Sequence, residues 1–387
     1  MILIVLDGAG CGALPDAPAY GDEGSDTLGN VAARVPLRVP HLRRLGLGEI
    51  VPLGGGTPPR AEGAWGRMSE ASAGKDSVTG HWEMAGLVLD APFPTFPRGF
   101  PREVIEAFER RIGRGVIGNV AASGTEIIDR LGAEHMRTGA PIVYTSADSV
   151  FQLAAHEAVI PPAELHRMCE QAFDLVSLGF GVARVIARPF DGRPGAFRRT
   201  SNRHDYAMAP AGETLLDALS KDGLPVLAIG KVSDLFGGRG ITRSWATSSD
   251  TEGMACVAAR AADTGHGLIF ANLVDFDTVY GHRNDVAGYA ANLERFDEQL
   301  GWLLARLRAD DLLVLTGDHG NDPTTPSTDH SREYVPLLVT GSRVPGAVPL
   351  GTRRTFADLG QTIAANFGVG PLAHGVSFLE EIRVDHS

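Results

Sequence analysis

GLIFANLVDFD (residues 267–277) and LLVLTGDHG (residues 312–320) are two short apolar runs, and each ends in acidic residues. Between them, residues 287–308 repeat apolar side chains at the helical period and predict an amphipathic helix. Strand, helix and strand in this order form a crossover unit, which favours an open, mostly parallel sheet with helices on both faces. Such sheets bind ligands beyond the carboxyl ends of their strands, where these acidic residues lie.

The chain begins with a segment of the same kind. ILIVL (2–6) stops at Asp7 and leads into the glycine-rich GAGCGALPD (8–16), as expected for a buried parallel strand that ends in a loop. We therefore predict an α/β protein in which three strands end at Asp7, Asp277 and Asp318.

The middle of the chain differs in composition. From about residue 92 it is rich in proline and glycine (APFPTFPRGFP, 91–101), and it then predicts a strand at 141–144, a helix at 163–178 and a strand at 182–187. The earlier pattern resumes after about residue 210. We expect a core formed by residues 1–91 and 209–387, with an inserted α+β cap domain at 92–208.

Charge and composition exclude several classes of protein. The chain has 387 residues and a formal net charge of -12, which argues against a diffuse basic surface for nucleic acid. The N-terminal apolar run is too short for a signal peptide, and no later run approaches the roughly 18 residues of a membrane span. Three widely spaced cysteines, Cys11, Cys169 and Cys256, indicate reduced thiols. We expect a cytoplasmic protein. The sequence is compatible with a monomer and does not determine the oligomeric state.

Three aspartates and three histidines fall in four short segments, three of which follow the predicted strands. They are Asp7, Asp277, His282, Asp318, His319 and His330. Carboxylate and imidazole ligands together suit divalent ions such as Mn²⁺ or Zn²⁺, and six ligands suit two neighbouring ions that clamp a phosphoryl group. Any one Asp–His pair could instead form a turn or a helix cap. The coincidence of three strand ends favours a two-metal site.

The segment SEASAGKDSVTGHWE (69–83) contains candidate nucleophiles. If Thr79 opens a helix that runs to about residue 87, its oxygen lies at a positive helix end, which favours phosphate. The alternative is that Thr79 or Ser77 only caps that helix. Cys11, between two glycines, is interpreted as a small filler without a basic partner to lower its pKa.

Seven segments carry a family resemblance. They are GKDSVTGHWEMAGL (74–87), IVYTSADSVFQLAAHE (142–157), ARVIARPF (183–190), RTSNRHDYA (199–207), GKVSDLF (230–236), NLVDFDTVYGHRND (272–285) and TGDHGNDPT with TDHSREYVPLL (316–338). In this order along nearly the whole chain, they resemble the phosphopentomutases of the alkaline phosphatase-like superfamily. The resemblance implies an alkaline phosphatase-like core with an inserted cap domain.

The resemblance also implies roles at the metal site. Asp7, Asp318 and His319 would hold one Mn²⁺ beside Thr79, the residue that becomes phosphorylated. The second Mn²⁺ would be bound by Asp277, His282 and His330.

For the substrate, the resemblance implies five residues: Ser146, Asp148, Arg184, Arg203 and Lys231. Asp148, with Ser146 nearby, would bind the sugar hydroxyls, and the three basic residues would bind the distal phosphate, which arginine can bind bidentately. Arg188 and Arg193 are interpreted as solvated surface charges.

Two positions depart from the family pattern. The family usually has a serine directly after the first metal aspartate, where this chain has Gly8. In addition, TPSTDH (325–330) differs from the aromatic and glycine residues that the family usually has in this segment. Neither departure removes a ligand, although each could alter the surroundings of the metals.

The implied reaction interconverts ribose 1-phosphate and ribose 5-phosphate, and the 2-deoxy pair, through phospho-Thr79 and a bisphosphate. Glucose 1,6-bisphosphate or ribose 1,5-bisphosphate would be the activator. The alternatives are a phosphatase or a phosphoglycerate-type mutase on the same core, and a non-catalytic metal-bound sugar-phosphate sensor. The sugar-binding residues of the cap domain favour a pentose phosphate, and a sensor would not need a nucleophile.

Overall fold

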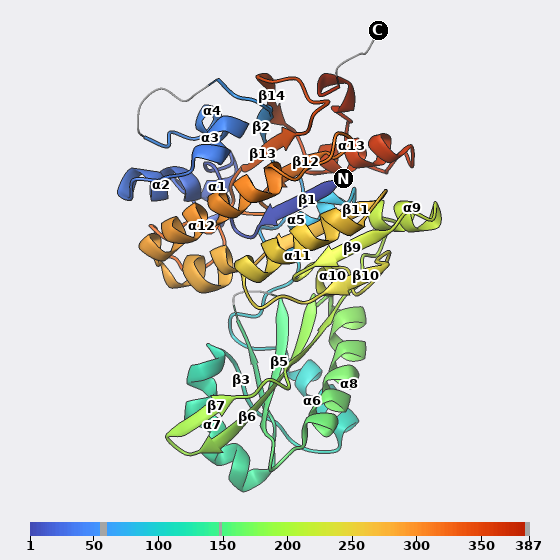
Figure 1. Ribbon diagram of the computed structural model, residues 1–387. Coiled ribbons are helices and arrows are strands. Elements are labelled where there is room, and N and C mark those ends of the chain that lie inside the picture. The colour runs from blue at the N-terminus through green and yellow to red at the C-terminus, as the bar shows by residue number, and fades with distance from the viewer. Residues whose placement is uncertain (55–59, 147–148, 384–387) are drawn as a thin grey trace. The chain divides into compact units, whose positions relative to one another are not determined.

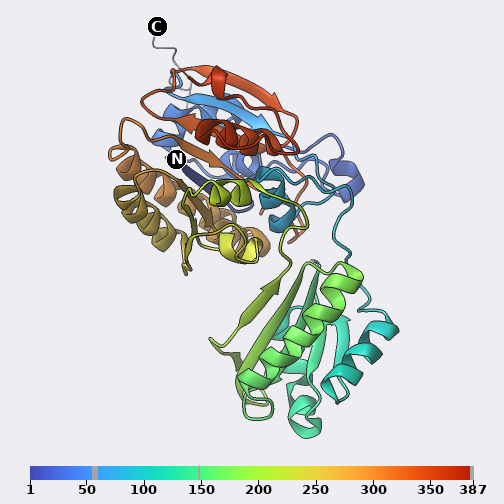
Figure 2. The same ribbon diagram turned by 90° about the vertical axis from the view of Figure 1, so that its right-hand side faces the viewer.

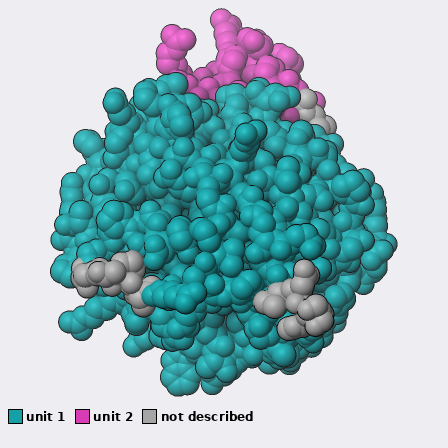
Figure 3. Space-filling model, turned by 90° about the horizontal axis from the view of Figure 1, so that it is seen from above, with its two compact units in different colours: residues 1–92, 210–387 teal, residues 93–209 magenta. Residues whose placement is uncertain are grey.

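The computed structural model describes residues 1–54, 60–146 and 149–383. It divides into two compact units, a core of Met1–Pro92 with Pro210–Ser387 and an inserted unit of Phe93–Ala209 (Figure 3). The mixed α/β class expected from the sequence is confirmed.

The core contains an eight-stranded sheet in the order β10-β9-β11-β1-β12-β13-β2-β14 (Figure 1). Its strands are β1 (Ile2–Leu6), β2 (Ala64–Met68), β9 (Val226–Ile229), β10 (Arg243–Trp245), β11 (Leu268–Leu273), β12 (Leu313–Thr316), β13 (Val335–Thr340) and β14 (Val348–Arg353). The first five strands in the sheet are parallel, and β13 runs antiparallel to both of its neighbours. Every residue of β1, β11 and β12 is buried, as expected for apolar runs covered on both faces.

The N-terminal strand lies in the middle of this sheet. Ile2 is paired with Ile269 of β11 on one side and with Leu313 of β12 on the other. The two strands of the predicted crossover are therefore separated by β1. This order brings the carboxyl ends of the three strands side by side.

Helices cover both faces of the core sheet (Figures 1 and 2). They are α1 (Ala17–Tyr20), α2 (Thr27–Arg34), α3 (Pro40–Leu45), α4 (Leu47–Ile50), α5 (Ser77–Met84), α9 (Leu215–Lys221), α10 (Val232–Leu235), α11 (Asp250–Asp263), α12 (Val286–Leu304) and α13 (Ala357–Phe367). Helices α2, α3, α11 and α12 share one hydrophobic core with β1. Helices α5 and α9 both contact α13.

Helix α12 ends at Leu304, four residues before the predicted end at Arg308. The main-chain N–H of Arg308 donates to the Asp311 carboxylate at 2.8 Å, and its guanidinium bonds the same carboxylate. This local turn competes with a further turn of helix. Leu307 nevertheless packs against the same core.

The inserted unit has a six-stranded sheet in the order β3-β4-β5-β6-β7, with β8 paired to β6. Its elements are α6 (Arg102–Ile112), β3 (Ile117–Ala121), α7 (Gly124–Thr138), β4 (Ile142–Thr145), β5 (Val150–His156), α8 (Pro162–Phe180), β6 (Arg184–Arg193), β7 (Ala196–Arg199) and β8 (His204–Ala207). Strand β6 extends beyond the predicted residue 187 because it forms a hairpin with β7. One face packs against α6 and α8, and the other packs against α7.

Two further observations concern membrane-spanning helices and cysteines. Within the described residues, no helix has both the length and the apolar character that a membrane crossing requires. All three cysteines are free thiols.

Candidate metal centre and active site

The six predicted metal ligands lie together at the carboxyl ends of β1, β11 and β12. Asp7 directly follows β1, and Asp318 and His319 follow β12. Asp277 lies in a π-helical turn, η1 (Phe276–Tyr280), and His282 lies in the 3₁₀ turn η2 (Gly281–Arg283) that follows it. His330 is in the segment before β13.

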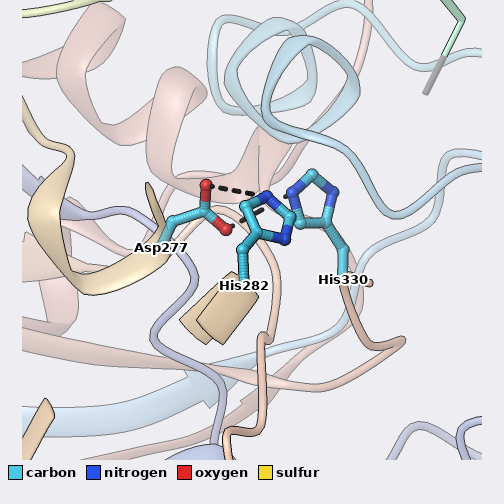
Figure 4. Close-up of side chains that lie close together, drawn as sticks. All are labelled: Asp277, His282 and His330. Atoms are coloured by element: carbon cyan, nitrogen blue, oxygen red, sulfur yellow. Dashed lines mark ion pairs between the residues drawn. The ribbon is translucent and has the colours of Figure 1, made fainter. Parts of the chain in front are cut away.

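Asp277, His282 and His330 form one group of possible ligands (Figure 4). The Nε2 atom of His282 lies 3.3 Å from Asp277 Oδ2, and Nε2 of His330 lies 3.3 Å from Oδ1. Although burial opposes ionisation, His330 and His282 hold the pKa of Asp277 well below its usual range. An ionised carboxylate between two imidazoles is a suitable donor set for a divalent ion of the Mn²⁺ or Zn²⁺ type.

The second group of possible ligands consists of Asp7, Asp277 and His319. Asp7 and His319 belong to the other predicted triad together with Asp318, and all three of its members are essentially inaccessible to solvent. The Nε2 atom of His319 lies 3.3 Å from Asp7 Oδ1 and 3.6 Å from Asp318 Oδ2. Against the effect of burial, the Lys231 ammonium, 2.9 Å from Asp7 Oδ2, lowers the pKa of Asp7. The possible ligand atoms of Asp277, Asp7 and His319 lie within 4.8 Å of one another, so Asp277 belongs to both groups.

The surroundings of one Asp318 oxygen show that these residues suit a metal ion. Asp318 Oδ2 is buried and has no hydrogen-bond partner. The Nδ1 atom of His81 lies 3.2 Å away, but it makes a 2.8 Å hydrogen bond with the Ser77 carbonyl oxygen. A buried carboxylate oxygen without a donor is costly unless a cation binds it. The donor set therefore fits a metal ion.

Gly8, the departure from the family pattern, has a structural explanation. Its φ is +76°, and a Cβ atom there would lie 3.1 Å from Asn321 Cβ. Glycine adopts this backbone conformation without strain. The turn directs the N–H of Gly8 to Asp318 Oδ1 at 3.0 Å, so the glycine helps to orient a predicted metal ligand.

Helix α5 carries Thr79 and begins beside the first group. Its N-cap is Asp76, which accepts hydrogen bonds from the N–H groups of Val78 and Thr79. The alternative that Thr79 or Ser77 caps the helix is therefore wrong, because Asp76, which precedes both, provides the cap. Thr79 is fully buried in the first turn of the helix, which ends at Met84 instead of near residue 87.

Ser77, which the sequence suggested only as a possible helix cap, lies at the site. Its Oγ atom lies 3.3 Å from Asp7 Oδ1 and 3.2 Å from His319 Nε2. Close packing of the helix explains this position, since a Cβ atom at Gly80 would lie 2.2 Å from the Asp318 carbonyl oxygen. The contact depends on three segments far apart in the chain, and no local pattern indicates it.

Arg332 and Glu333 hold segments around the site together, and the sequence analysis did not predict either role. Arg332 donates to Glu70 Oε2 at 2.8 Å and to the carbonyl oxygens of Ser72 and Gly74, which ties the segment before α5 to the segment that carries His330. Glu333 accepts from both the N–H and the hydroxyl of Thr27. Burial raises the pKa of Glu333 to about 7. The available sequence signal was a pair of charged residues that a single residue separates from a buried strand.

The predicted substrate residues are distributed differently. Ser146 follows β4 and Arg184 begins β6, where it pairs with Val150 of the intervening strand β5. Arg203 makes a two-pronged contact with Asp205, with both distances at 2.6 Å. Lys231 contacts Asp7 in the core. Asp148 lies outside the described residues.

Arg188 is not the solvated surface charge that the sequence analysis expected. Its Nε donates to Gln152 Oε1 at 2.8 Å, and burial lowers its pKa to about 10. It lies four residues after Arg184 in β6, and strand alternation places both on one face of the sheet. That spacing was visible in the sequence and is the signal that could have identified it.

Comparison with known proteins agrees with this geometry. The chain matches the metalloenzyme superfamily over residues 1–371. It is 56% identical over 383 residues to a phosphopentomutase of Caldanaerobacter subterraneus subsp. tengcongensis, with 99% of this chain and 98% of that protein covered. A phosphopentomutase of Carboxydothermus hydrogenoformans is 55% identical with 99% of both chains covered, and one of Thermotoga maritima is 54% identical with 98% of both covered. The chain belongs to the phosphopentomutase family of the metalloenzyme superfamily and is an enzyme of the isomerase class.

Proposed function

We propose that this member of the phosphopentomutase family interconverts α-D-ribose 1-phosphate and D-ribose 5-phosphate, and the corresponding 2-deoxyribose phosphates. The observation that carries the proposal is the meeting of six candidate metal-binding side chains with the first turn of α5, where Ser77 touches Asp7 and His319. The names of the relatives supply the class of substrate.

Two Mn²⁺ ions would be held by the two groups of ligands, one by Asp7, Asp318 and His319 and the other by Asp277, His282 and His330. When bound, the ions would neutralise charge that develops on the transferring phosphoryl group. The buried oxygen of Asp318 that lacks a donor supports this assignment.

Thr79 would carry the phosphoryl group between sugars. Phospho-Thr79 would donate to the free hydroxyl of a pentose phosphate, and the bisphosphate formed would return its other phosphoryl group to Thr79. The position of Thr79 in the first turn of α5 favours a phosphate, and the buried position of its side chain limits the access of bulk water that could hydrolyse the intermediate. A sugar bisphosphate would be needed to phosphorylate Thr79 initially.

The inserted unit would supply recognition of the sugar. Ser146 and Asp148 would bind hydroxyls, and Arg184 and Arg203 would bind the distal phosphate together with Lys231. The paired guanidinium nitrogens of Arg203 already bind a carboxylate in two-pronged fashion, the geometry that a phosphate also accepts.

The proposal is tested with Mn²⁺, ribose 1,5-bisphosphate and ribose 5-phosphate by following ribose 1-phosphate and free phosphate together. We expect ribose 1-phosphate as the main product and a loss of at least about a thousandfold for Thr79→Ala, because a covalent route disappears. Thr125→Ala, at an exposed threonine in the first turn of α7, should leave the rate unchanged. Free phosphate as the main product would indicate a phosphatase, and binding without turnover would indicate a sensor.

A further inference from the structure

The hydroxyl of Thr79 has a specific partner that the proposed function does not use. Its Oγ1 donates to Asp76 Oδ2 at 2.7 Å. Among the described residues, Asp76 is the one hydrogen-bond partner of this oxygen. A side chain that removes a proton during catalysis must lie within about 2.6–3.2 Å of the atom that carries it, and Asp76 meets this requirement.

The other oxygen of Asp76 holds the carboxylate in place. Oδ1 accepts from the N–H of Val78 at 3.0 Å and from the N–H of Thr79 at 3.1 Å. These bonds fix the carboxylate at the start of α5 and leave Oδ2 directed at the hydroxyl. One side chain therefore has two separable contacts, one with the helix backbone and one with the reacting atom.

The Asp76 carboxylate is also free of a neutralising cation. In the described part of the chain, no Lys, Arg or His nitrogen lies within ion-pair distance of it. The adjacent Lys75 instead contacts Asp22 at 3.0 Å and Asp329 at 3.6 Å. Asp76 is partly exposed whereas Thr79 is fully buried, so Asp76 can exchange a proton with water that Thr79 cannot reach.

We propose that Asp76 is a catalytic residue that accepts the Thr79 hydroxyl proton as this oxygen takes a phosphoryl group, an inference that depends on the proposed phosphorylation of Thr79. The bond between Thr79 Oγ1 and phosphorus forms while an ester O–P bond of the bisphosphate breaks. The departing sugar oxygen keeps the electron pair and takes a proton from water. The threonine proton passes to Asp76 Oδ2 and then to solvent, and in the reverse step Asp76 returns it to Thr79.

Replacing Asp76 separates this role from helix capping. Asparagine retains an oxygen for the two backbone N–H groups, and serine is also a good N-cap, but neither offers a carboxylate to the hydroxyl. We expect Asp76→Asn and Asp76→Ser to slow phosphorylation of Thr79 by about 10²–10⁴-fold, with unchanged Mn²⁺ content and thermal midpoint. The matched control is Asp26→Asn, at the aspartate that caps α2 through Gly29 N–H, which should leave the rate unchanged.

The experiment uses the Mn²⁺-loaded full chain and ribose 1,5-bisphosphate in a quenched-flow instrument, with phospho-Thr79 measured by peptide mass spectrometry. Absence of phospho-Thr79 in the wild-type protein would defeat the proposed function itself. If the wild-type protein is phosphorylated and Asp76→Asn matches its rate, the role of Asp76 is overturned. If Asp26→Asn slows phosphorylation as much as Asp76→Asn does, the role of Asp76 is overturned in favour of helix capping alone. The role is also overturned if the slower rate of Asp76→Asn is accompanied by a loss of Mn²⁺ or by a lower thermal midpoint.

Discussion

The core and the inserted unit present their candidate functional residues in opposite ways. Asp7, Asp318 and His319 are buried and come from strands that are distant in sequence. Arg203, in the inserted unit, has a side chain that is 49% exposed and pairs with Asp205, two residues away. The core site therefore depends on the whole fold, whereas the arginine contact depends on local sequence. We infer that the chemistry tolerates little change and that sugar recognition can be altered by single substitutions.

The largest effect is expected at Asp277, which belongs to both groups of possible ligands. Asp277→Asn removes the charge that His282 and His330 face, and the loss of metal affinity should exceed the roughly 10–100-fold that changes around a ligand produce. Mn²⁺ content by elemental analysis and mutase turnover should fall together.

The corresponding change in the inserted unit is Asp191→Asn, at an exposed carboxylate that contacts Arg198. Exposed ion pairs contribute little to stability, so Mn²⁺ content and turnover should match the wild-type protein. Equal losses in both variants would remove the distinction between the two units.

An intermediate effect is expected from pH, with opposite signs in the two units. In the core, burial raises the pKa values of Glu333 and Asp250 to about 7, above the unfolded values near 4. The folded core then binds more protons than the unfolded chain between about pH 4 and 7. Its free energy of unfolding should fall by a few kcal/mol as the pH rises through this range.

In the inserted unit, burial lowers the pKa of His135. The unfolded chain then binds the extra proton, so this contribution to stability grows as the pH rises toward the unfolded value of about 6.5. Hydrogen exchange of β5, where His135 Nε2 accepts from the N–H of His156, should show slower opening at pH 7 than at pH 5.

The core can be followed separately because all four tryptophans lie outside residues 93–209. The free energy of unfolding can be measured by urea denaturation of chelator-treated protein, followed by tryptophan fluorescence. It should change less with pH in Glu333→Gln than in the wild-type protein, because the glutamine side chain does not ionise. A core that becomes more stable between pH 5 and 8 would show that these buried carboxyls do not determine the slope.

The smallest effect is expected at Arg203. Arg203→Ala removes a charged hydrogen-bond donor from the proposed phosphate contact, and such a bond contributes about 1.5–3 kcal/mol when fully formed. Because the side chain is half exposed, we expect a rise of about tenfold in KM for ribose 5-phosphate with kcat and Mn²⁺ content unchanged. Arg198→Ala, in the exposed pair with Asp191, is the control. A fall in kcat without a change in KM would contradict a recognition role.

Apolar runs that end in aspartate were sufficient to predict the strands and the three carboxylates at their ends, because burial and strand termination are local properties of sequence. The order of strands in the sheet was not predictable in this way. Nothing within residues 1–16 indicates that β1 pairs with both β11 and β12, since pairing depends on side chains that are distant in the chain.

The same limit applies to residues around the site. Asp76 was overlooked as a cap because Ser77 and Thr79 are also good capping residues, and only the backbone shows which one begins the helix. The spacing of Arg184 and Arg188 was visible in the sequence, but the hydrogen bond between Arg188 and Gln152 depends on a neighbouring strand. Arg332 was missed because its partners, Glu70, Ser72 and Gly74, lie far away in sequence.

The central place of β1 has a consequence for synthesis of the protein. Residues 2–6 leave the ribosome long before their pairing partners, which begin at Ile269 and Leu313. The inserted unit is one continuous segment, so it can fold while the first strand is still unpaired, and the core must wait for most of the chain. During that interval ILIVL is an exposed apolar edge. A stalled or truncated chain that ends before residue 268 should therefore aggregate through residues 2–6, even with a folded inserted unit.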